Sequence, residues 1–575
     1  MKKQSLKVLS IMLVAVIGLT ACDGLGKLVK NAGSITYKVT PKTLEAHGDS
    51  VVITIDGTYP AKVFPKKATV TVTPVVVYDG GEVAFKDEVL IGEAVEGDET
   101  KISNASGGSF SYTSNKVAYV PGMKVATLEL RAKGQVKSKI KELPAKKIAD
   151  GTIATSYLVK SDDKALIGED KFQKIIPRHY TSNIFFAINK STVRSSEIKG
   201  EEFIGFKTFV LEAIYKGSDF KGMNISAYAS PDGELTLNEG LAEDRAKAAA
   251  NAMMKFFKSK KVDSAAAAEF YTTVTTAEDW AGFKEAMEAS SIADKDLILR
   301  VLTMYPDGET REKEIKNLSE TYEEVKESIL PKLRRAVLTL NIEEKSRTDE
   351  QITALVASHP DSLSVEEILY AATLVDEINA KLEIYKKAAT VYPKDWRTAN
   401  NMGYIYLMQN KMEDAEAAFT KADGLKPGNP IVKNNLGIVA RRNGDRNLAL
   451  ELFAEAASAG DAVAYNVGIV HIQNGSYAEA VESFGDNNSL NSALAKLLSG
   501  DNDGAMAAIS ESDEAETALG LYLKAIVNAR KNSPAEVISN LKAAIEKDGS
   551  YKEMAASDAE FLALKANNEF TSLVN

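Results

Sequence analysis

The pattern of apolar and polar residues changes twice along the chain and divides it into three regions. In residues 34–165 apolar and polar positions alternate, which is the period-two pattern of strands with one buried face. In residues 171–344 strand-like and helix-like stretches take turns, and in residues 364–575 the spacing is helical throughout. The chain is therefore predicted to be multidomain, with a β domain, a mixed α/β domain and an all-α domain in that order.

The first region predicts an antiparallel β-sandwich. Thr69-Val70-Thr71-Val72-Thr73 places valines on one face and threonines on the other. Strands are expected at residues 35–39, 51–55, 69–73, 109–112, 124–131 and 153–159, separated by turns at 56–57, 79–81, 106–108 and 121–122. A spacer or packing role is favoured for this domain over adhesion or sugar binding.

The second region predicts strands and helices in alternation, followed by a long helical insertion and a last strand. Strands are expected at residues 183–188, 223–228, 270–274 and 335–342, helices at 203–215 and 237–257, and the insertion at 277–330.

The third region repeats itself with a period of about 34 residues. Gly403, Ala415 and Phe419 recur as Gly437, Ala449 and Phe453, and then as Gly468, Ala480 and Phe484. A glycine lets paired helices approach closely and a phenylalanine fills the gap to the next helix. This pattern resembles the tetratricopeptide repeat, which implies a curved solenoid of five or six stacked helix pairs.

The resemblance also implies a protein partner on the concave surface of the repeats. Asparagines recur just before the small-residue position, and their amides are suited to hydrogen-bond a bound backbone. Hydrogen bonding between neighbouring helices is the open alternative for them. The candidate partner-binding residues are Asn400, Asn401, Asn434, Asn435 and Asn466.

The first 22 residues have the composition of a secretory signal. Lys2, Lys3 and Lys7 precede an apolar run at residues 8–19 that is too short to span a bilayer. Leu19-Thr20-Ala21-Cys22 resembles a bacterial lipobox, which implies cleavage before Cys22 and its lipidation. An ordinary signal with an incidental cysteine is the alternative.

Cys22 is the only cysteine in the chain, so a lipidated mature protein would hold no disulfide. Acyl chains on one residue anchor a protein without making it cross the membrane. Residues 23–33 are predicted as a linker. Because no long acidic run follows Cys22, we expect the periplasmic face of the outer membrane.

The stretch 225–246 joins a short strand, a Pro231-Asp232-Gly233 turn and an alanine-rich helix with Asn238 and Arg245 near its start. Together with Arg334-Arg335 before the last strand, it resembles the OmpA C-terminal-like domain in a divergent subgroup. This resemblance implies an α/β fold of order β-α-β-α-β-β, here with the helical insertion. It also implies binding of peptidoglycan.

In that family an Asp and an Arg together hold the diaminopimelate of the peptidoglycan stem peptide, the Arg by a two-pronged contact with a carboxylate. Asn238 and Arg245 match family positions, whereas Ser230 stands where the family has the Asp. Asp232, two residues later, could supply the carboxylate. In the alternative, Asp232 only forms the turn and Arg245 only pairs with a neighbouring group of its own fold.

Composition and the absence of known motifs argue against nucleic-acid binding, metal binding and enzyme activity. The net charge of −10 is spread over 575 residues, so no basic surface indicates a nucleic-acid partner. The four histidines are scattered without metal-ligand spacing, and there is no P-loop, dinucleotide fingerprint or nucleophile elbow. No enzyme activity, metal or cofactor is therefore predicted.

These features predict a non-enzymatic periplasmic lipoprotein that tethers the outer membrane to peptidoglycan and recruits protein partners through its repeats. The first alternative is an assembly or secretion adaptor whose OmpA-like domain no longer binds peptidoglycan. The second is a surface-exposed lipoprotein for glycan binding or adhesion.

Overall fold

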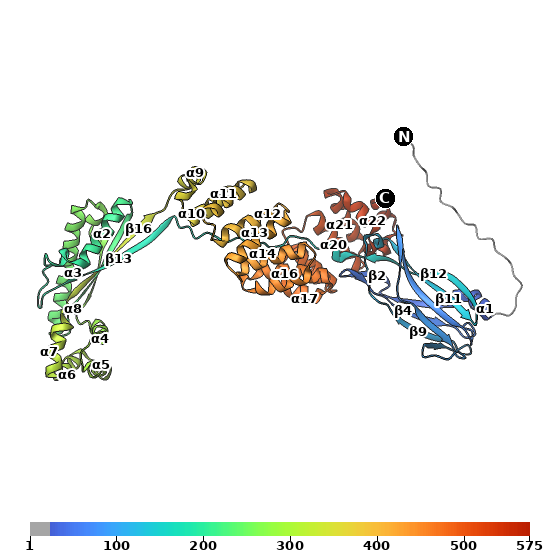
Figure 1. The fold of residues 1–575 in the computed structure, drawn as a ribbon, viewed down its shortest axis with the longest axis horizontal. Coiled ribbons are helices and arrows are strands. Elements are labelled where there is room, and N and C mark those ends of the chain that lie inside the picture. The colour runs from blue at the N-terminus through green and yellow to red at the C-terminus, as the bar shows by residue number, and fades with distance from the viewer. Residues whose placement is uncertain (1–23) are drawn as a thin grey trace. The chain divides into compact units, whose positions relative to one another are not determined.

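The computed structural model describes residues 24–575, so Cys22 and the expected signal segment lie outside the described residues. The chain forms two compact units (Figure 1). The first unit combines the chain up to Gly168 with Pro393–Asn575, and the second is Glu169–Tyr392. The chain thus leaves the first unit after the β-rich region and returns to it for the repeats.

The β-rich region consists of two sheets. The smaller sheet has the order β1 (Thr36–Thr40), β4 (Thr54–Tyr59), β9 (Gly108–Thr113). The larger sheet has the order β10 (Val117–Ala118), β3 (Ser50–Val51), β2 (Thr43–His47), β12 (Lys139–Ile153), β11 (Ala126–Val136), β5 (Thr69–Tyr78), β7 (Glu88–Gly92), β8 (Thr100–Ile102), with β6 (Gly81–Ala84) beside β5. Apolar residues from both sheets, including Val70, Val72, Ile55 and Phe110, share one core.

Three details of this region differ from the sequence prediction. Two strand pairs, β2–β12 and β7–β8, are parallel, so the larger sheet is mixed. The expected turn at Asp56-Gly57 lies inside β4, where a Cβ on Gly57 would lie 2.1 Å from Cε1 of Phe110 on β9. The predicted strand at 153–159 is wrong, because β12 ends at Ile153 and Thr155–Leu158 is a 3₁₀ turn.

The stretch predicted as a linker contains the short helix α1 (Gly24–Lys30). Its Leu25 and Leu28 are fully buried in the core of the β-rich region. This region is therefore structured from the first described residues onward.

The second unit is built on a four-stranded sheet of order β13 (Ile175–Phe185), β16 (Arg335–Lys345), β14 (Asp219–Tyr228), β15 (Tyr271–Thr276). The β14–β15 pair is parallel and the other two pairs are antiparallel. Helices α2 (Glu201–Tyr215) and α3 (Leu235–Ser259) contribute phenylalanines and alanines to its core. In chain order this is β-α-β-α-β, a helical segment, and β.

The helical segment before β16 has a small core of its own. Its helices are α4 (Trp280–Glu288), α5 (Lys295–Met304), α6 (Gly308–Lys316), α7 (Ser319–Ser328) and α8 (Leu330–Leu333). After β16 the second unit ends with α9 (Asp349–Ser358), α10 (Val365–Ala371) and α11 (Ile378–Val391). The sequence pattern had placed the start of the repeat domain at residue 364, ahead of α10.

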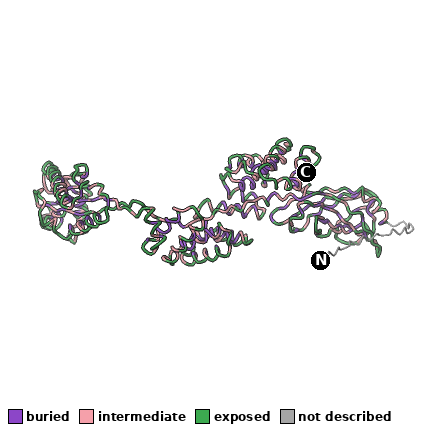
Figure 2. The backbone as a smooth tube through the Cα atoms, turned by 90° about the horizontal axis from the view of Figure 1, so that it is seen from above, coloured by how far each residue is buried: buried purple, intermediate pink, exposed green. Residues whose placement is uncertain are grey.

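The repeats form pairs of helices joined by short turns. The pairs are α12 (Trp396–Met408) with α13 (Met412–Leu425), α14 (Pro430–Arg442) with α15 (Arg446–Glu455), α16 (Asp461–Asn474) with α17 (Tyr477–Phe484), α18 (Leu490–Leu498) with α19 (Asn502–Glu511), and α20 (Ala518–Arg530) with α21 (Pro534–Lys547). The chain ends with α22 (Ser550–Ser557), the 3₁₀ helix η10 (Ala559–Leu564) and α23 (Asn568–Val574). Figure 2 shows buried and exposed residues interspersed along these helices.

Candidate functional site

An extended segment of the chain itself lies against the first helices of successive repeat pairs. This segment, residues 160–168, is called the strap here, and it has no regular secondary structure. It follows the β-rich region in sequence and belongs to the first unit. Its contacts are made with helices α12, α14, α16 and α18, more than 200 residues further along the chain.

Four asparagines, called the asparagine ladder here, each bind one strap residue through both ends of the amide. The strap N–H donates to the side-chain Oδ1 and the side-chain Nδ2 donates to the strap carbonyl. The donor–acceptor distances are 2.7 and 2.9 Å for Gly168 on Asn401, 2.8 and 2.7 Å for Leu166 on Asn435, 2.8 and 3.1 Å for Lys164 on Asn466, and 2.8 and 3.0 Å for Lys160 on Asn491. The ladder therefore satisfies alternate backbone groups of an extended chain.

The remaining amides connect one repeat to the next. Nδ2 of Asn435 donates to Oδ1 of Asn400 at 2.9 Å, and Nδ2 of Asn466 donates to Oδ1 of Asn434 at 2.9 Å. Asn400 and Asn434 also donate to the strap carbonyls of Leu166 and Lys164. All these asparagines are at most 1% exposed, so their hydrogen bonds are made out of contact with water.

Charged side chains hold the middle of the strap. Oδ1 and Oδ2 of Asp163 accept from Nε and Nη2 of Arg441 at 2.7 and 2.6 Å, and Oδ2 also accepts from Nε of Arg442 at 2.9 Å. The side chains of Asp163 and Arg441 are 0% and 2% exposed. Such a buried, fully hydrogen-bonded pair is costly to separate, because either partner alone would be an unpaired buried charge.

A tyrosine lies beside this charge pair. The Tyr465 hydroxyl donates to both carboxylate oxygens of Asp162 at 2.8 Å, and Nζ of Lys164 lies 4.5 Å from the Tyr465 ring centroid. Burial raises the pKa of Tyr465 well above its usual range, and the Asp162 carboxylate acts in the same direction. The hydroxyl therefore remains a donor at all physiological pH values.

The sequence located the five repeat asparagines but not what they hold. The structure brings all five together on the strap, and each uses its amide within this chain. Sequence reasoning missed Asn491, Asp163 and Arg441. Asn491 stands two positions before the small residue Ala493, as the other ladder asparagines stand two positions before a glycine, and this shared spacing was the available signal. Nothing in the strap sequence marks Asp163 as buried.

The four residues that were predicted to bind peptidoglycan also lie close together, around the turn between β14 and α3. Asn238 Nδ2 donates to the carbonyls of Ser230 at 3.1 Å and Gly233 at 3.2 Å, and the Ser230 hydroxyl donates to the Asp232 carboxylate. Asn238 therefore fixes the turn, and the Asp232 carboxylate is held at the Ser230 hydroxyl by a hydrogen bond.

Arg245 is 1% exposed, and two of its donors are already used. Its Nε donates to the Lys190 carbonyl at 3.1 Å and its Nη1 to the Tyr228 carbonyl at 2.8 Å, while the guanidinium lies 5.4 Å from the Phe186 ring centroid. The pKa of Arg245 is lowered to about 10, mainly by burial and also by the positive charge of Arg334, while Asp232 opposes the shift. Arg245 is thus still a cation at neutral pH.

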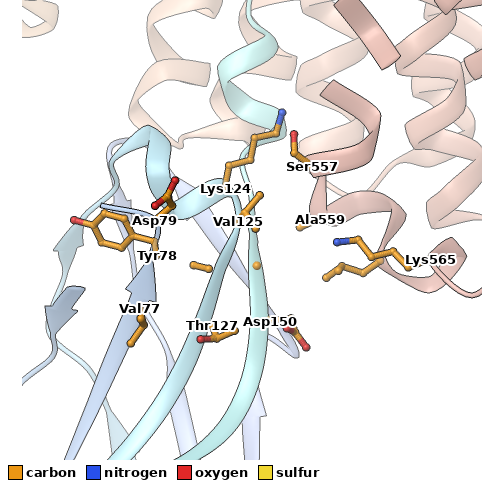
Figure 3. A pocket seen from close by; sticks show the side chains of 13 residues that line it. Val77, Tyr78, Asp79, Lys124, Val125, Thr127, Asp150, Ser557, Ala559 and Lys565 are labelled. Atoms are coloured by element: carbon orange, nitrogen blue, oxygen red, sulfur yellow. The ribbon is translucent and has the colours of Figure 1, made fainter. Parts of the chain in front are cut away.

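A small cavity of about 320 Å³ lies within the first unit, between the β-rich region and the C-terminal helices (Figure 3). Figure 3 shows Tyr78 and Asp79 on one side, Ser557 and Lys565 on the other, and Lys124 between them. These groups are dispersed around the cavity and do not converge on one point.

No group of three or more His, Cys, Asp or Glu side chains in residues 24–575 is placed to bind a metal ion. In the same part of the chain, no helix combines the length and the apolar character needed to cross a membrane.

Solved structures are similar to part of the chain. A tetratricopeptide repeat protein from Parabacteroides merdae is 17% identical over 36% of this chain and 90% of its own, with a TM-score of 0.30. Pseudomonas aeruginosa PilF is 16% identical over 37% and 100%, with a TM-score of 0.30. PilW, described as a widely conserved type IV pilus biogenesis factor, is 14% identical over 40% and 100%, with a TM-score of 0.29. No protein-family model and no curated protein matches the chain.

The helix pairs of residues 396–547 form a helical repeat region, and a β-rich region precedes it in the sequence.

Proposed function

We propose that the protein is a non-enzymatic scaffold of the bacterial envelope that links the outer membrane to peptidoglycan. In this proposal Cys22 carries the lipid anchor on the periplasmic face, the second unit is the OmpA-like domain that meets the cell wall, and the repeats are of the tetratricopeptide type. The observation that carries the proposal is the strap. It leads the chain from the β-rich region, which would carry the lipid anchor, into the second unit, which would meet the cell wall.

The strap supports a tethering role because it is held more firmly than a simple linker needs to be. Four strap residues are bound through both backbone groups, and Asp163 is bound by two arginines. A connection under tension benefits from such bonds, since several must break before the chain can extend. A flexible linker with no partners would be enough if the two units only had to be attached.

The chain that follows the proposed lipid anchor is also closely packed. Cys22 precedes the first residue of α1, Gly24, by two positions, and α1 buries Leu25 and Leu28 in the β-rich core. A lipid on Cys22 would therefore hold this region close to the bilayer. This arrangement favours a membrane-proximal periplasmic scaffold over a surface protein on a long stalk.

The second unit supports the cell-wall contact through its element order and through Arg245. Along the chain its elements follow the order β-α-β-α-β, helical segment, β, which is the element order that the OmpA-like proposal requires. Ser230, Asp232, Asn238 and Arg245 lie around one turn, where a ligand carboxylate would meet a guanidinium.

A second candidate function is an assembly adaptor whose OmpA-like domain has no peptidoglycan ligand. The burial of Arg245 favours it, because Nε and Nη1 already donate to backbone carbonyls. In that case Arg245 stabilises the loop at Lys190 and the end of β14, and protein partners carry the function.

Sedimentation with purified sacculi distinguishes the two candidates. We expect the wild-type protein to co-sediment and Asp232→Asn to bind about 10-fold or more weakly, since charged hydrogen bonds contribute about 1.5–3 kcal/mol. Ser230→Asp introduces the aspartate that the OmpA-like family has at this position, and it should strengthen binding to sacculi. If wild type and Ser230→Asp both stay in solution while remaining folded, the tethering half of the proposal is wrong and the adaptor stands.

The anchor is tested separately by labelling cells with a radioactive fatty acid. Label on the wild-type protein, and none on Cys22→Ser, is the expected result. Equal labelling of both proteins, or of neither, would remove the lipid anchor from the proposal.

A further inference from the structure

The second unit contains a pocket that none of the predicted site residues lines. It has a volume of about 490 Å³ and is formed by the chain that follows β13 and by the segment just before β16. Its walls include the apolar side chains Phe186, Ile188 and Pro331 and the cations Arg194, Lys332 and Arg334. Apolar surface and positive charge therefore meet in one hollow.

Arg334 is the unusual member of this set. Its side chain is only 9% exposed, its Nε is buried without a hydrogen-bond partner, and among the described residues its guanidinium has no ion pair. The adjacent Arg335 differs, because its Nη2 lies 3.0 Å from Oδ2 of Asp279 and its guanidinium lies 4.9 Å from the Tyr228 ring centroid. Of these two consecutive arginines, one is paired inside the fold and the other is free to receive a ligand.

A buried guanidinium without a partner is costly, so an anion that reaches it gains both charge pairing and hydrogen bonds. Burial lowers the pKa of Arg334, and Asp232 opposes this shift from a distance. The one acid that lines the pocket, Glu197, is already used: Oε1 accepts from Nη2 of Arg194 at 2.7 Å and Oε2 accepts from the Phe185 N–H at 3.2 Å. Lys332 is exposed at the rim and adds to the positive charge.

We propose that this pocket binds a carboxylate carried on an apolar body, with Arg334 as its anchor. The planar guanidinium suits a carboxylate because both oxygens can accept parallel hydrogen bonds. Phe186, Ile188 and Pro331 offer the apolar body a surface that a bare inorganic anion would not use. Arg245 does not line this pocket, and two of its donors are bound to the carbonyls of Lys190 and Tyr228.

The pocket lies beside the proposed peptidoglycan contact, because Asp232 acts electrostatically on Arg334 and Arg245 donates to the Lys190 carbonyl in the loop after β13. None of the residues proposed to meet peptidoglycan lines the pocket, so the two sites can be tested separately. Sacculus binding can therefore fail while small carboxylates still bind, and the reverse is equally possible.

Titration of the full chain with benzoate, followed by ligand-observed NMR, tests the proposal. Benzoate should bind saturably, whereas benzyl alcohol, which lacks the charge, and phosphate, which lacks the apolar body, should bind at least 10-fold more weakly. Arg334→Gln should weaken benzoate binding at least 10-fold. Arg300→Gln removes the same charge from an exposed position on α5 and should change nothing.

A second variant keeps the test decisive if Arg334→Gln does not fold. Ile188 is 55% exposed, so Ile188→Glu adds a negative charge at the pocket without disturbing the core, and benzoate binding should fall by a similar factor. The proposal is overturned if benzoate does not bind, if phosphate binds as tightly as benzoate, or if the folded Arg334 and Ile188 variants bind like wild type.

Discussion

The Asp163 carboxylate accepts hydrogen bonds from two arginines in a place that water does not reach. Asp163→Ala should therefore lower the free energy of opening the strap by about 3–5 kcal/mol, because Arg441 would remain buried without its partner. Hydrogen–deuterium exchange at the amides of residues 160, 164, 166 and 168 measures this opening.

Ser161→Ala is the matched control on the same strap, because Ser161 is exposed and its side chain has no hydrogen bond to a described residue. Fast exchange in both variants would mean that the strap opens for a reason other than the buried pair.

His471 on α16 supplies a pH-dependent contribution to stability. Burial lowers the pKa of His471 below its usual value of 6.5. The unfolded chain then takes up the proton at a higher pH than the folded one, so stability falls as the pH drops through 6.5 towards the folded pKa. His471→Gln should reduce the loss of melting temperature between pH 7 and pH 5. His179→Gln, at an exposed position on β13, should leave that loss unchanged.

Among the elements, the repeat helices depend on the contact between a glycine and a phenylalanine. A Cβ on Gly437 would lie 2.6 Å from Cε1 of Phe453, and Gly403 and Gly468 face Phe419 and Phe484 at 2.6 and 2.7 Å. Such distances are too short for a real Cβ, so the paired helices would have to separate.

Gly437→Ala should therefore destabilise the repeats by about 1–3 kcal/mol, although alanine has the higher helix propensity. Gly424→Ala on α13 has no atom within 4 Å of the new Cβ and should be neutral or stabilising. Urea unfolding monitored by far-ultraviolet circular dichroism compares the two variants. A destabilised Gly424→Ala with an unaffected Gly437→Ala would contradict this account.

The elements that the sequence predicted well are those whose signal is local. The 34-residue spacing of glycines and phenylalanines fixes the repeat helices, because both members of each contact lie within one helix pair. β12 was missed for the opposite reason: its 15 residues include four lysines and Pro144 and have no clear alternation, yet it pairs with β11 and β2. Long-range pairing overrides its weak propensity.

In the candidate sites, too, the sequence predicted local features but not contacts between distant parts of the chain. The recurrence of asparagines located the ladder, but its occupant lies more than 200 residues earlier in a stretch, KSDDKALIG, that has no periodic pattern. Arg334 looked like part of the family's Arg-Arg ending. Only the fold reveals that it is buried without a partner while Arg335 is paired.

At the scale of the whole molecule, the strap makes the first unit a product of chain segments that are distant in sequence. It contacts the repeat helices within the same chain, so its effective concentration there is far above that of a free peptide. An extended segment of another protein would have to displace it. External partners of the repeats are therefore expected on surfaces other than the asparagine ladder.

Other contacts join the β-rich region to the repeats. Arg446 forms an ion pair with Asp49 at 2.7 Å, and Nδ1 of His47 lies 3.2 Å from the Tyr477 hydroxyl. These contacts are more exposed than the strap and contribute less. The strap is thus expected to contribute more to this association than these two contacts do.

Protease sites introduced at Glu169–Lys171 and at Pro393–Lys394, both without regular secondary structure, would leave residues 24–168 and the repeats as separate chains. Because the strap remains on the first fragment, the two fragments should still co-elute in size-exclusion chromatography at micromolar concentration. An Asn435→Ala, Asn466→Ala double variant removes two of the four bidentate contacts and should weaken their association at least 10-fold. Separation of the wild-type fragments on cutting would mean that covalent continuity, rather than the strap's contacts, holds the first unit together.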